Sequence, residues 1–218
     1  MGVDFANNYL DLAALGNCAD MMSLTSIETK ELMKEGFQRD NVKNPFFEYM
    51  IQKNEFSMKS IINPTTVAFY IAPFVNAMTR SGTLDEKNIT FLSMLKYKAF
   101  KMINSNKRGH KLGEKEKLVM QAVRTVTNVK ARQTKRQNEG LETIERMIEE
   151  QNLLDHKVLL FLMEPGIIDK NIAGLIANKI MAKYQRPTCI LTKVDNTYQG
   201  SARGCTLAGI PDFKAICE

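Results

Sequence analysis

Two carboxylates stand inside an apolar run near the start of the sequence, in the stretch YLDLAALGNCADMMSL at residues 9–24. Burying a carboxylate costs free energy unless the group is paired or binds a metal ion. Hard divalent cations such as Mg²⁺ and Mn²⁺ prefer carboxylate oxygens as ligands. Asp20 comes shortly after Gly16, a pattern that fits a strand end whose carboxylate points into a cleft. Asp11 and Asp20 are therefore candidate metal ligands, and the alternative for each is a helix cap or an ordinary salt bridge.

A dense basic segment runs from Lys96 to Arg136. It holds 13 lysines and arginines against two acids, Glu114 and Glu116, so its net charge of +11 leaves −5 for the rest of a chain whose total is +6. A loop and helix with this charge suit contact with the phosphate backbone of a nucleic acid. The alternative is a solvated helix face that only keeps the protein soluble. The acidic balance elsewhere favours nucleic acid, and it makes Arg132 and Arg136 candidate contacts.

The elements that must position these residues change in kind along the chain. Residues 28–39 and 85–104 have helical composition or spacing, and residues 67–82 begin as a strand-like apolar run that Pro73 interrupts. Residues 114–154 carry an apolar stripe with helical period and no proline. As one helix this segment would be about 60 Å long at about 1.5 Å per residue. A break at Gly140 into two ordinary helices is the alternative, since an internal glycine costs about 1 kcal/mol.

The last part of the sequence predicts a small sheet. VLLFLM reads as a buried strand, DKNIAGLIANKIMAKY as an amphipathic helix, RPTCILTKVD as a second strand and TYQGSARG as a third. A strand, a helix and a strand in this order form a βαβ unit with a parallel strand pair. We therefore expect an α/β fold with a domain boundary near residue 154 and the long helix as the connector.

The composition is that of a soluble globular protein, with 44% hydrophobic and 25% charged residues. Cys18, Cys189, Cys205 and Cys217 are scattered without a CxxC pair. This spacing disfavours a zinc ribbon or a disulfide scaffold and indicates a reducing compartment. The longest strongly apolar run, at 158–163, is too short to cross a bilayer. We expect a cytoplasmic protein with no membrane partner.

Several stretches together resemble the RecJ family of single-stranded-DNA exonucleases, in the DHH phosphoesterase superfamily. LDLAALGNCADMMSL resembles the family's LDLVALGTVADVVPL, and KELMKEGFQR resembles LVKEGLKR. FYIAPFVNAMTRSG is similar to FxIAPRINAAGRLG, and GLIANKIMAKYQRPTCIL to GIVASRLVEKYGRPVIVL. GSARG followed by IPDF is similar to GSGRS followed by IPGF. Each match is short, but all fall in the family's order over nearly the whole chain.

The resemblance implies roles for individual residues. Asp20 matches an aspartate that ligates a catalytic metal ion, Mn²⁺ or Mg²⁺, whereas Asp11 is expected to be structural. Asn76 and Arg80 match the NA-x-x-R segment that lines the groove beside the active site. Ser201 and Arg203 match a GS-x-R loop that holds the DNA backbone, although GSARG alone also fits a plain hairpin turn. An arginine can grip a phosphate with two parallel hydrogen bonds.

Departures from the family pattern are as informative as the matches. Phe74 replaces an expected arginine, Glu164 replaces a histidine, and the DHH and DxDADG motifs that carry most metal ligands are absent, as is the C-terminal GGH motif. The resemblance thus implies a piece of a longer single-stranded-DNA exonuclease, in which metal ions would activate a water for in-line phosphodiester hydrolysis. We expect this chain alone to be inactive and to bind single-stranded DNA in a salt-sensitive way.

In these terms, residues 1–84 would be the end of a DHH domain, 85–154 a helical connector with the long basic helix, and 155–218 a partial DHH-associated, substrate-binding domain with a mixed sheet. A missing strand would leave an open sheet edge through which chains could self-associate. One alternative function is a non-catalytic RecJ-like module that binds nucleic acid or serves as a scaffold. Another is a fragment of a different DHH phosphodiesterase that acts on short oligonucleotides.

Overall fold

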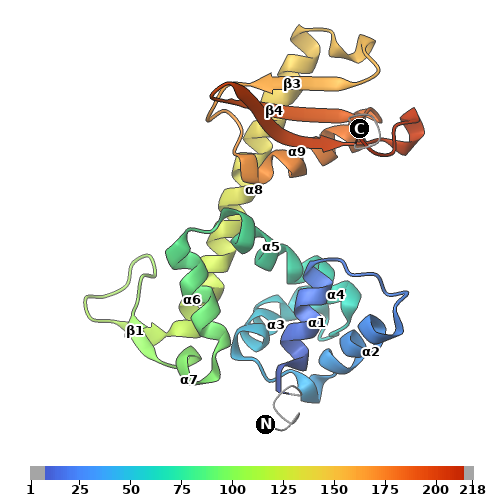
Figure 1. Cartoon of the computed structure of the whole chain (residues 1–218). Coiled ribbons are helices and arrows are strands. Elements are labelled where there is room, and N and C mark those ends of the chain that lie inside the picture. Colours follow the sequence, from blue (N-terminus) through green and yellow to red (C-terminus); the bar gives the residue numbers. More distant parts are fainter. Residues whose placement is uncertain (1–7, 214–218) are drawn as a thin grey trace. The chain divides into compact units, whose positions relative to one another are not determined.

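The structure is a computed structural model that describes residues 8–213 (Figure 1). The chain divides into two compact units, Met1–Lys130 and Ala131–Glu218. The division falls within α8 (Leu118–Glu150), so this helix contributes its first part to one unit and its remainder to the other. The α/β class predicted from the sequence is confirmed, while the predicted domain boundaries near residues 84 and 154 stay a prediction.

The first unit is almost entirely helical. It contains α1 (Leu10–Ala19), α2 (Ile27–Gly36), a 3₁₀ turn (Arg39–Asn41), α3 (Pro45–Met58), α4 (Pro64–Tyr70), α5 (Ala72–Ser81), α6 (Leu84–Met94), α7 (Lys96–Ala99), β1 (Met102–Asn104), β2 (Lys115–Lys117) and the start of α8. Its core is a single cluster centred on Phe46, Phe47 and Met50 of α3, which are fully buried. Apolar side chains of α1 and α8 belong to the same cluster. Burial of these aromatic and aliphatic side chains is what holds the short helices together.

The sequence analysis predicted that residues 67–82 begin as a strand-like run. This prediction is wrong, because the segment forms α4 and α5. Asn63 caps α4 through a hydrogen bond from the Thr66 backbone N–H to the Asn63 side chain (2.8 Å), and the Thr66 hydroxyl accepts in turn from the Asn63 N–H (3.1 Å). Pro73 lies in the first turn of α5, where a missing N–H costs nothing because that donor has no intrahelical partner. The capping box and the proline position outweigh the strand-like composition of Val67 to Ile71.

The segment with the long apolar stripe is one continuous helix rather than two. α8 comprises 33 residues, which corresponds to about 50 Å at about 1.5 Å per residue. Its start is later than predicted, because residues 115–117 form β2. Gly140 lies inside the helix, and a Cβ atom placed there would come within 2.5 Å of Ile176 Cδ1. The glycine therefore makes room for a neighbouring helix instead of ending its own.

The second unit contains the predicted βαβ arrangement, which is confirmed. Its elements after α8 are a 3₁₀ turn (Leu153–Asp155), β3 (Leu159–Met163), α9 (Lys170–Tyr184), β4 (Thr188–Val194), β5 (Thr197–Arg203) and a 3₁₀ turn (Thr206–Ala208). The strand order is β3–β4–β5, with β3 parallel and β5 antiparallel to β4. In register, Phe161 faces Ile190, and Ile190 faces Ser201.

One face of this sheet is covered and the other is open. Leu159, Phe161 and Met163 point into a core shared with the end of α8 and with α9. The alternating residues Leu160 and Leu162 are each about half exposed, as the two-residue period of a strand requires. Self-association through a sheet edge stays a prediction.

Two sequence-based expectations concern the surroundings of the protein. In the described part of the chain, no helix combines the length and the apolar character needed to cross a bilayer. Cys18, Cys189 and Cys205 form no disulfide, and Cys217 lies outside the described residues. The cytoplasmic location stays a prediction.

Candidate functional site

Asp20 stands immediately after the last residue of α1, so the predicted strand end is wrong. Its backbone N–H donates to the Gly16 carbonyl at 2.9 Å and closes the final helical turn. The chain then reverses at Met21, which has a left-handed φ of 53°. The Asp20 residue is exposed, and no described residue bonds its carboxylate. A carboxylate at the negative end of a helix is disfavoured by the helix dipole, whereas a cation there is favoured.

Asp11 has a structural role, as the sequence analysis expected. It is fully buried, and its carboxylate accepts hydrogen bonds from the backbone N–H groups of Lys43 (2.8 Å) and Asn44 (2.6 Å). It also accepts one from Leu12 in its own helix (2.8 Å). These donors satisfy the charge without a metal ion, so Asp11 joins α1 to the start of α3.

Asn76 contacts the residue immediately before Asp20. Its Nδ2 donates to the Ala19 carbonyl at 2.9 Å, so the amide of α5 holds the last residue of α1. Arg80 follows four residues later and therefore shares the same face of α5, with an exposed side chain in the last turn. The structure thus brings Asn76 to the end of α1 that carries Asp20, while Arg80 lies further along the same face of α5. The sequence analysis placed Asn76 only in a groove and missed this positioning bond.

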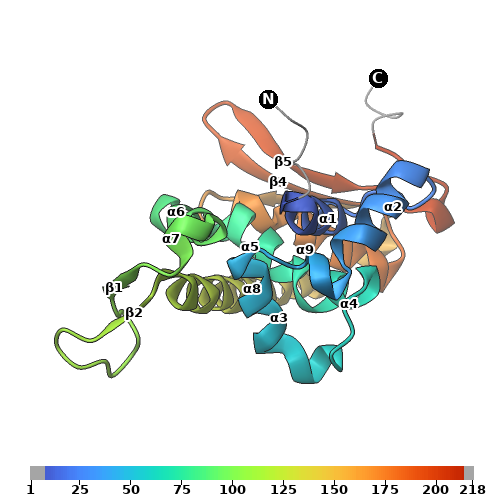
Figure 2. The ribbon, with the colours of Figure 1, turned by 90° about the horizontal axis from the view of Figure 1, so that it is seen from below.

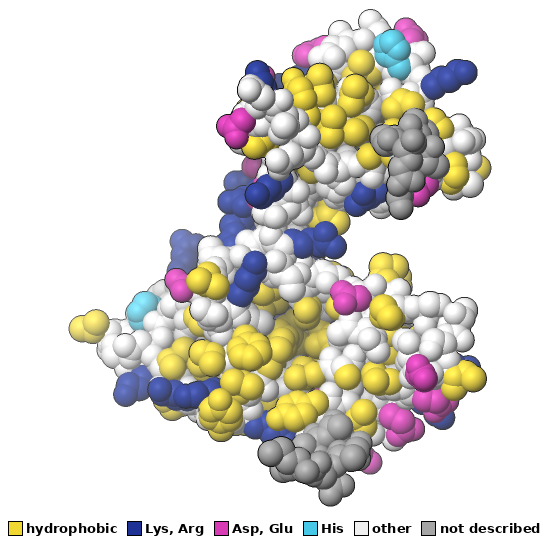
Figure 3. Space-filling view, viewed as in Figure 1, with side chains coloured by type: hydrophobic (Ala, Val, Ile, Leu, Met, Phe, Trp, Pro, Cys, Tyr) yellow, Lys and Arg dark blue, Asp and Glu magenta, His cyan; other side chains and the backbone are white. Residues whose placement is uncertain are grey.

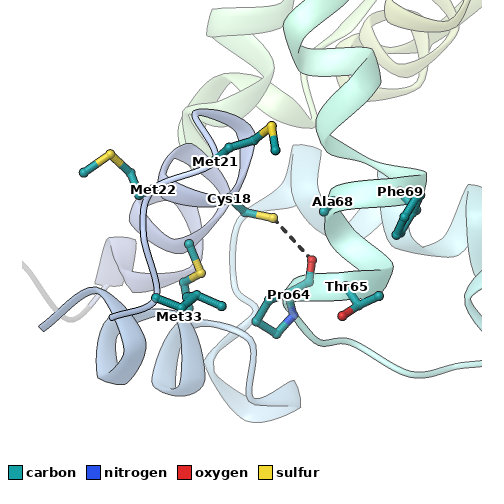
Figure 4. Close-up of a pocket in the computed structure, with 9 residues that line it drawn as sticks. Cys18, Met21, Met22, Met33, Pro64, Thr65, Ala68 and Phe69 are labelled. Atoms are coloured by element: carbon teal, nitrogen blue, oxygen red, sulfur yellow. Dashed lines mark hydrogen bonds between the residues drawn. The ribbon is translucent and has the colours of Figure 1, made fainter. Parts of the chain in front are cut away.

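A small apolar pocket opens beside this corner of the first unit. The pocket has a volume of about 310 Å³. Figure 4 shows α1, the loop after it and α4 around it. The Cys18 thiol donates to the Pro64 carbonyl at 3.4 Å, and burial raises the pKa of this thiol. A thiol with a raised pKa keeps its proton at neutral pH. The pocket is lined by Cys18, Met21, Met22, Leu24, Met33, Pro64, Thr65, Ala68 and Phe69.

A complete metal site does not form within the described part of this chain. No three His, Cys, Asp or Glu side chains of residues 8–213 come together in a way that could hold a metal ion. Asp20 would be one ligand only. The residues present do not fit a self-sufficient Mn²⁺ or Mg²⁺ centre, and any bound ion requires ligands from outside these residues.

In the second unit, the Gly-Ser-x-Arg segment forms part of β5 rather than a loop or a hairpin turn. The Arg203 Nη1 atom donates to Ser201 Oγ (3.0 Å) and to the Ala202 carbonyl (2.7 Å). A Cβ atom at Gly174 of α9 would lie 2.7 Å from Arg203 Nη2 and 3.0 Å from Ser201 Oγ. Arg203 and Ser201 therefore lie against the first half of α9, where glycine leaves them space.

Arg136 approaches the same part of α9. Its guanidinium pairs with the Asp169 carboxylate at 3.4 Å, and Asp169 caps the helix by accepting from the Asn171 N–H at 2.9 Å. Arg132 lies one turn earlier on α8 and is half buried. Two arginines, Arg136 and Arg203, thus flank the N-terminal half of α9, whose dipole also favours an anion. The sequence analysis named these two arginines separately and did not foresee that both lie against the first half of α9.

Comparison with known proteins bears on this arrangement. The chain is 32% identical over 213 residues to YorK, named as an SPbeta prophage-derived single-strand DNA-specific exonuclease of Bacillus subtilis (strain 168), and equally to the YorK protein of Bacillus phage SPbeta. The match covers 96% of this chain. The chain is a relative of the RecJ-like exonucleases. It spans 36% of the length of these curated relatives. No protein-family model matches the chain.

Solved structures show the RecJ-like fold directly. RecJ of Thermus thermophilus in complex with Mn²⁺ superposes with a TM-score of 0.59 and 20% identity, over 85% of this chain and 24% of that one. The Mg²⁺ complex of the same protein gives 0.57, over 85% and 25%. A third structure, of exonuclease RecJ bound to manganese, gives 0.58, over 85% and 40%. At 20% identity this likeness shows the fold of the chain and nothing more.

Proposed function

We propose that this chain forms part of a metal-dependent, single-stranded-DNA-specific exonuclease. In this proposal it supplies one metal-binding carboxylate, Asp20, and a surface that binds the DNA backbone. The observation that carries the proposal is the 32% identity to YorK across 96% of this chain. The exposed carboxylate at the end of α1, held in place through Asn76, agrees with it.

The domain assignment follows from the same relationship. Residues 1–84 would be the end of a DHH domain, 85–154 the helical connector, and 155–218 part of a DHH-associated domain. The continuous α8 and the small mixed sheet agree with this assignment. The rest of the catalytic domain would then provide the other metal ligands.

The metal would be Mn²⁺ or Mg²⁺, since both appear in the structures of RecJ from Thermus thermophilus. Such an ion supplies charge stabilisation and an activated water for phosphodiester hydrolysis. The contribution of this chain is to hold the Asp20 carboxylate at a fixed point after α1. Because one aspartate is not a metal site, the chain alone is expected to be inactive.

Each unit contributes residues that would contact DNA. In the first unit, Arg80 lies on the α5 face that also holds Asp20 in place through Asn76. In the second, Arg136 and Arg203 flank the start of α9, with Ser201 beside Arg203 and Arg132 a turn away. Guanidinium groups next to a helix N-terminus favour a phosphate.

The test of this function uses a chimera in which this chain replaces the matching third of YorK. We expect the chimera to degrade a labelled single-stranded oligonucleotide in the presence of Mn²⁺. Asp20→Asn should abolish degradation, whereas Asp85→Asn, at the exposed start of α6, should not. Retained activity in the Asp20→Asn chimera would contradict the assigned ligand. Mn²⁺-dependent digestion by the isolated chain would contradict its expected inactivity.

A non-catalytic RecJ-like module that binds nucleic acid is the second candidate. The observation that favours it is that no metal-binding cluster forms within residues 8–213. In this case the chimera would remain inactive with an intact Asp20, while the isolated chain would still bind single-stranded DNA.

A further inference from the structure

Exposed aromatic side chains gather on α7 and at the base of the β1–β2 hairpin. Tyr97, within α7, is 76% exposed, and Phe100, directly after this helix, is 50% exposed. Met102, the first residue of β1, is also 52% exposed. Large apolar side chains that cluster on a surface mark an interaction site more often than isolated ones do. None of these residues belongs to the site described above.

The backbone holds these side chains outward. Ala99 of α7 is fully buried in the core of the first unit, whereas Tyr97 and Phe100 are exposed. The base of the hairpin is closed by a hydrogen bond from the Leu118 N–H to the Lys101 carbonyl at 2.9 Å. Met102 pairs with Lys117 across the two strands, so these side chains lie on the same face of the ribbon.

Hydrogen bonds from Arg124 of α8 hold the hairpin against the helical part of the first unit. Arg124 donates from Nη1 to the Glu116 carboxylate at 2.8 Å and from Nη2 to Asn106 Oδ1 at 2.6 Å. The Ser105 N–H bonds the Glu114 carbonyl at 2.8 Å and continues the pairing beyond the strands. Figures 1 and 2 both show the hairpin extending from the helical body with its loop outermost. The fold itself therefore positions this surface.

The surrounding charge is strongly positive. Residues 96–117 hold eight lysines and arginines against two acids, and one of these acids, Glu116, is neutralised by Arg124. Lys98 Nζ lies 5.5 Å from the Tyr97 ring centre, and Lys117 Nζ lies 5.6 Å from that of Phe100. In Figure 3, dark-blue basic side chains run beside yellow hydrophobic ones at the lower left, where Figure 1 shows α7 and the hairpin. Each ring thus has a lysine ammonium group close enough for both to contact one bound molecule.

We propose that Tyr97 and Phe100, with Lys98 and Lys117, form a platform on which unpaired nucleic-acid bases stack while the lysines contact the adjoining phosphates. This inference deepens the proposed function, on which it rests, by naming a DNA-binding surface separate from Asp20. Every base presents a π-face, so such a surface tolerates any sequence. A duplex keeps its bases stacked inside, so the platform selects single strands.

The rings and the lysines should affect binding differently. Aromatic stacking is lost by alanine substitution at a cost of about 5- to 150-fold in affinity per base. Loss of a lysine that contacts phosphate weakens binding equally for all single strands. It also reduces the slope of log affinity against log salt concentration by about one unit per contact.

The test measures fluorescence anisotropy of labelled single strands with the isolated chain, in EDTA so that no metal contributes. The probes are an oligo-dT strand, an abasic strand of equal length and a duplex. We expect the wild-type chain to bind oligo-dT at least about tenfold more tightly than the abasic strand. The double variant Tyr97→Ala, Phe100→Ala should bind oligo-dT and the abasic strand with equal affinity. The double variant Tyr97→Phe, Phe100→Tyr keeps both aromatic rings and should keep the preference for oligo-dT over the abasic strand.

Phe56→Ala is the matched control, because Phe56 is 96% exposed on α3 of the same unit and not on α7 or the hairpin. It should bind like the wild type. A preference for oligo-dT that survives the double alanine substitution would overturn the proposal, as would duplex binding as tight as that of oligo-dT. The measurement is made in EDTA and reads binding rather than degradation, so failure of the platform and failure of the nuclease assignment give different results.

Discussion

The Asp11 carboxylate accepts a hydrogen bond from the backbone N–H of Asn44 at 2.6 Å, across 33 residues of sequence. Asn44 in turn caps α3 by accepting from the Phe46 N–H (3.0 Å) and donates from Nδ2 to the Met94 carbonyl (2.8 Å). One buried carboxylate thus connects α1, α3 and the end of α6. The two aspartates of the N-terminal apolar run differ because, within residues 8–213, donors surround only the Asp11 carboxylate.

Asp11→Asn should lower the free energy of unfolding of the first unit. The substituted amide presents an NH₂ group where a backbone N–H now donates, so at least one buried donor is left unsatisfied, at a cost of about 1–3 kcal/mol. Urea denaturation followed by circular dichroism measures the change. The matched control is Asp20→Asn, at the exposed end of the same helix, which should stay within about 0.5 kcal/mol of the wild type. Equal stability of the two variants would contradict the connecting role of Asp11.

Asn76→Ala should loosen the chain around Asp20. Without the bond from Nδ2 to the Ala19 carbonyl, the turn in which Asp20, Met21 and Met22 donate back to α1 opens more often. Amide hydrogen exchange of these three residues should speed up, since local opening governs exchange.

Asn54→Ala is the control for this experiment. Asn54 Nδ2 also donates to a backbone carbonyl, at 2.7 Å, but that carbonyl belongs to Met50 in its own helix. Its loss should leave exchange at Asp20 unchanged. Unchanged exchange at residues 20–22 in Asn76→Ala would show that the amide does not hold this turn.

The sequence predicted the βαβ unit well because each element there is locally consistent. The strand at Leu159–Met163 is short and apolar, and α9 has a clear amphipathic pattern, so local preference and tertiary packing agree. At residues 67–82 they disagree. The β-branched and aromatic residues favour a strand, whereas the cap at Asn63, the position of Pro73 and the fully buried Val67 fit a helix.

The candidate site was predictable only in part. Asp20 was found through its motif, but its place at a helix end depends on α1 forming, which the short apolar run did not reveal. The bond between Asn76 and Ala19 joins residues 57 positions apart, and no local pattern signals it. Tyr97 and Phe100 fall within the segment predicted as helix at 85–104, and their exposure was not foreseen because tertiary packing decides it.

Gly140→Ala should destabilise the second unit although alanine favours a helix by about 1 kcal/mol over glycine. The new Cβ would meet Ile176 Cδ1 at 2.5 Å, so this side chain or α9 must shift. Ile176→Val removes the Cδ1 atom and should cost about 0.5–1.5 kcal/mol by itself. The double variant should be more stable than Gly140→Ala alone, which thermal unfolding of all four proteins measures. Additive effects of the two substitutions would show that they do not contact each other.

The ion pair between Arg124 and Glu116, which holds the hairpin beside the proposed stacking platform, should weaken at low pH. The hydrogen bonds from Arg124 are the main cause that lowers the pKa of Glu116 below its ordinary value of 4.5. A carboxyl whose pKa is lower in the folded state stabilises the fold fully above the unfolded value, and this contribution is lost as the pH falls below 4.5 through the folded pKa. Hydrogen exchange of the Ser105 and Leu118 amides, which bond the Glu114 and Lys101 carbonyls, reports on the hairpin alone.

Protection of these two amides should therefore fall with pH in the wild type and be low and nearly independent of pH in Glu116→Gln. Glu48→Gln is the control, because Arg39 likewise lowers the pKa of Glu48, but on α3. That variant should keep the pH dependence at the hairpin. If Glu116→Gln leaves the pH dependence intact, the ion pair with Arg124 does not hold the hairpin, and the position of Tyr97 and Phe100 must depend on the packing of α7 alone.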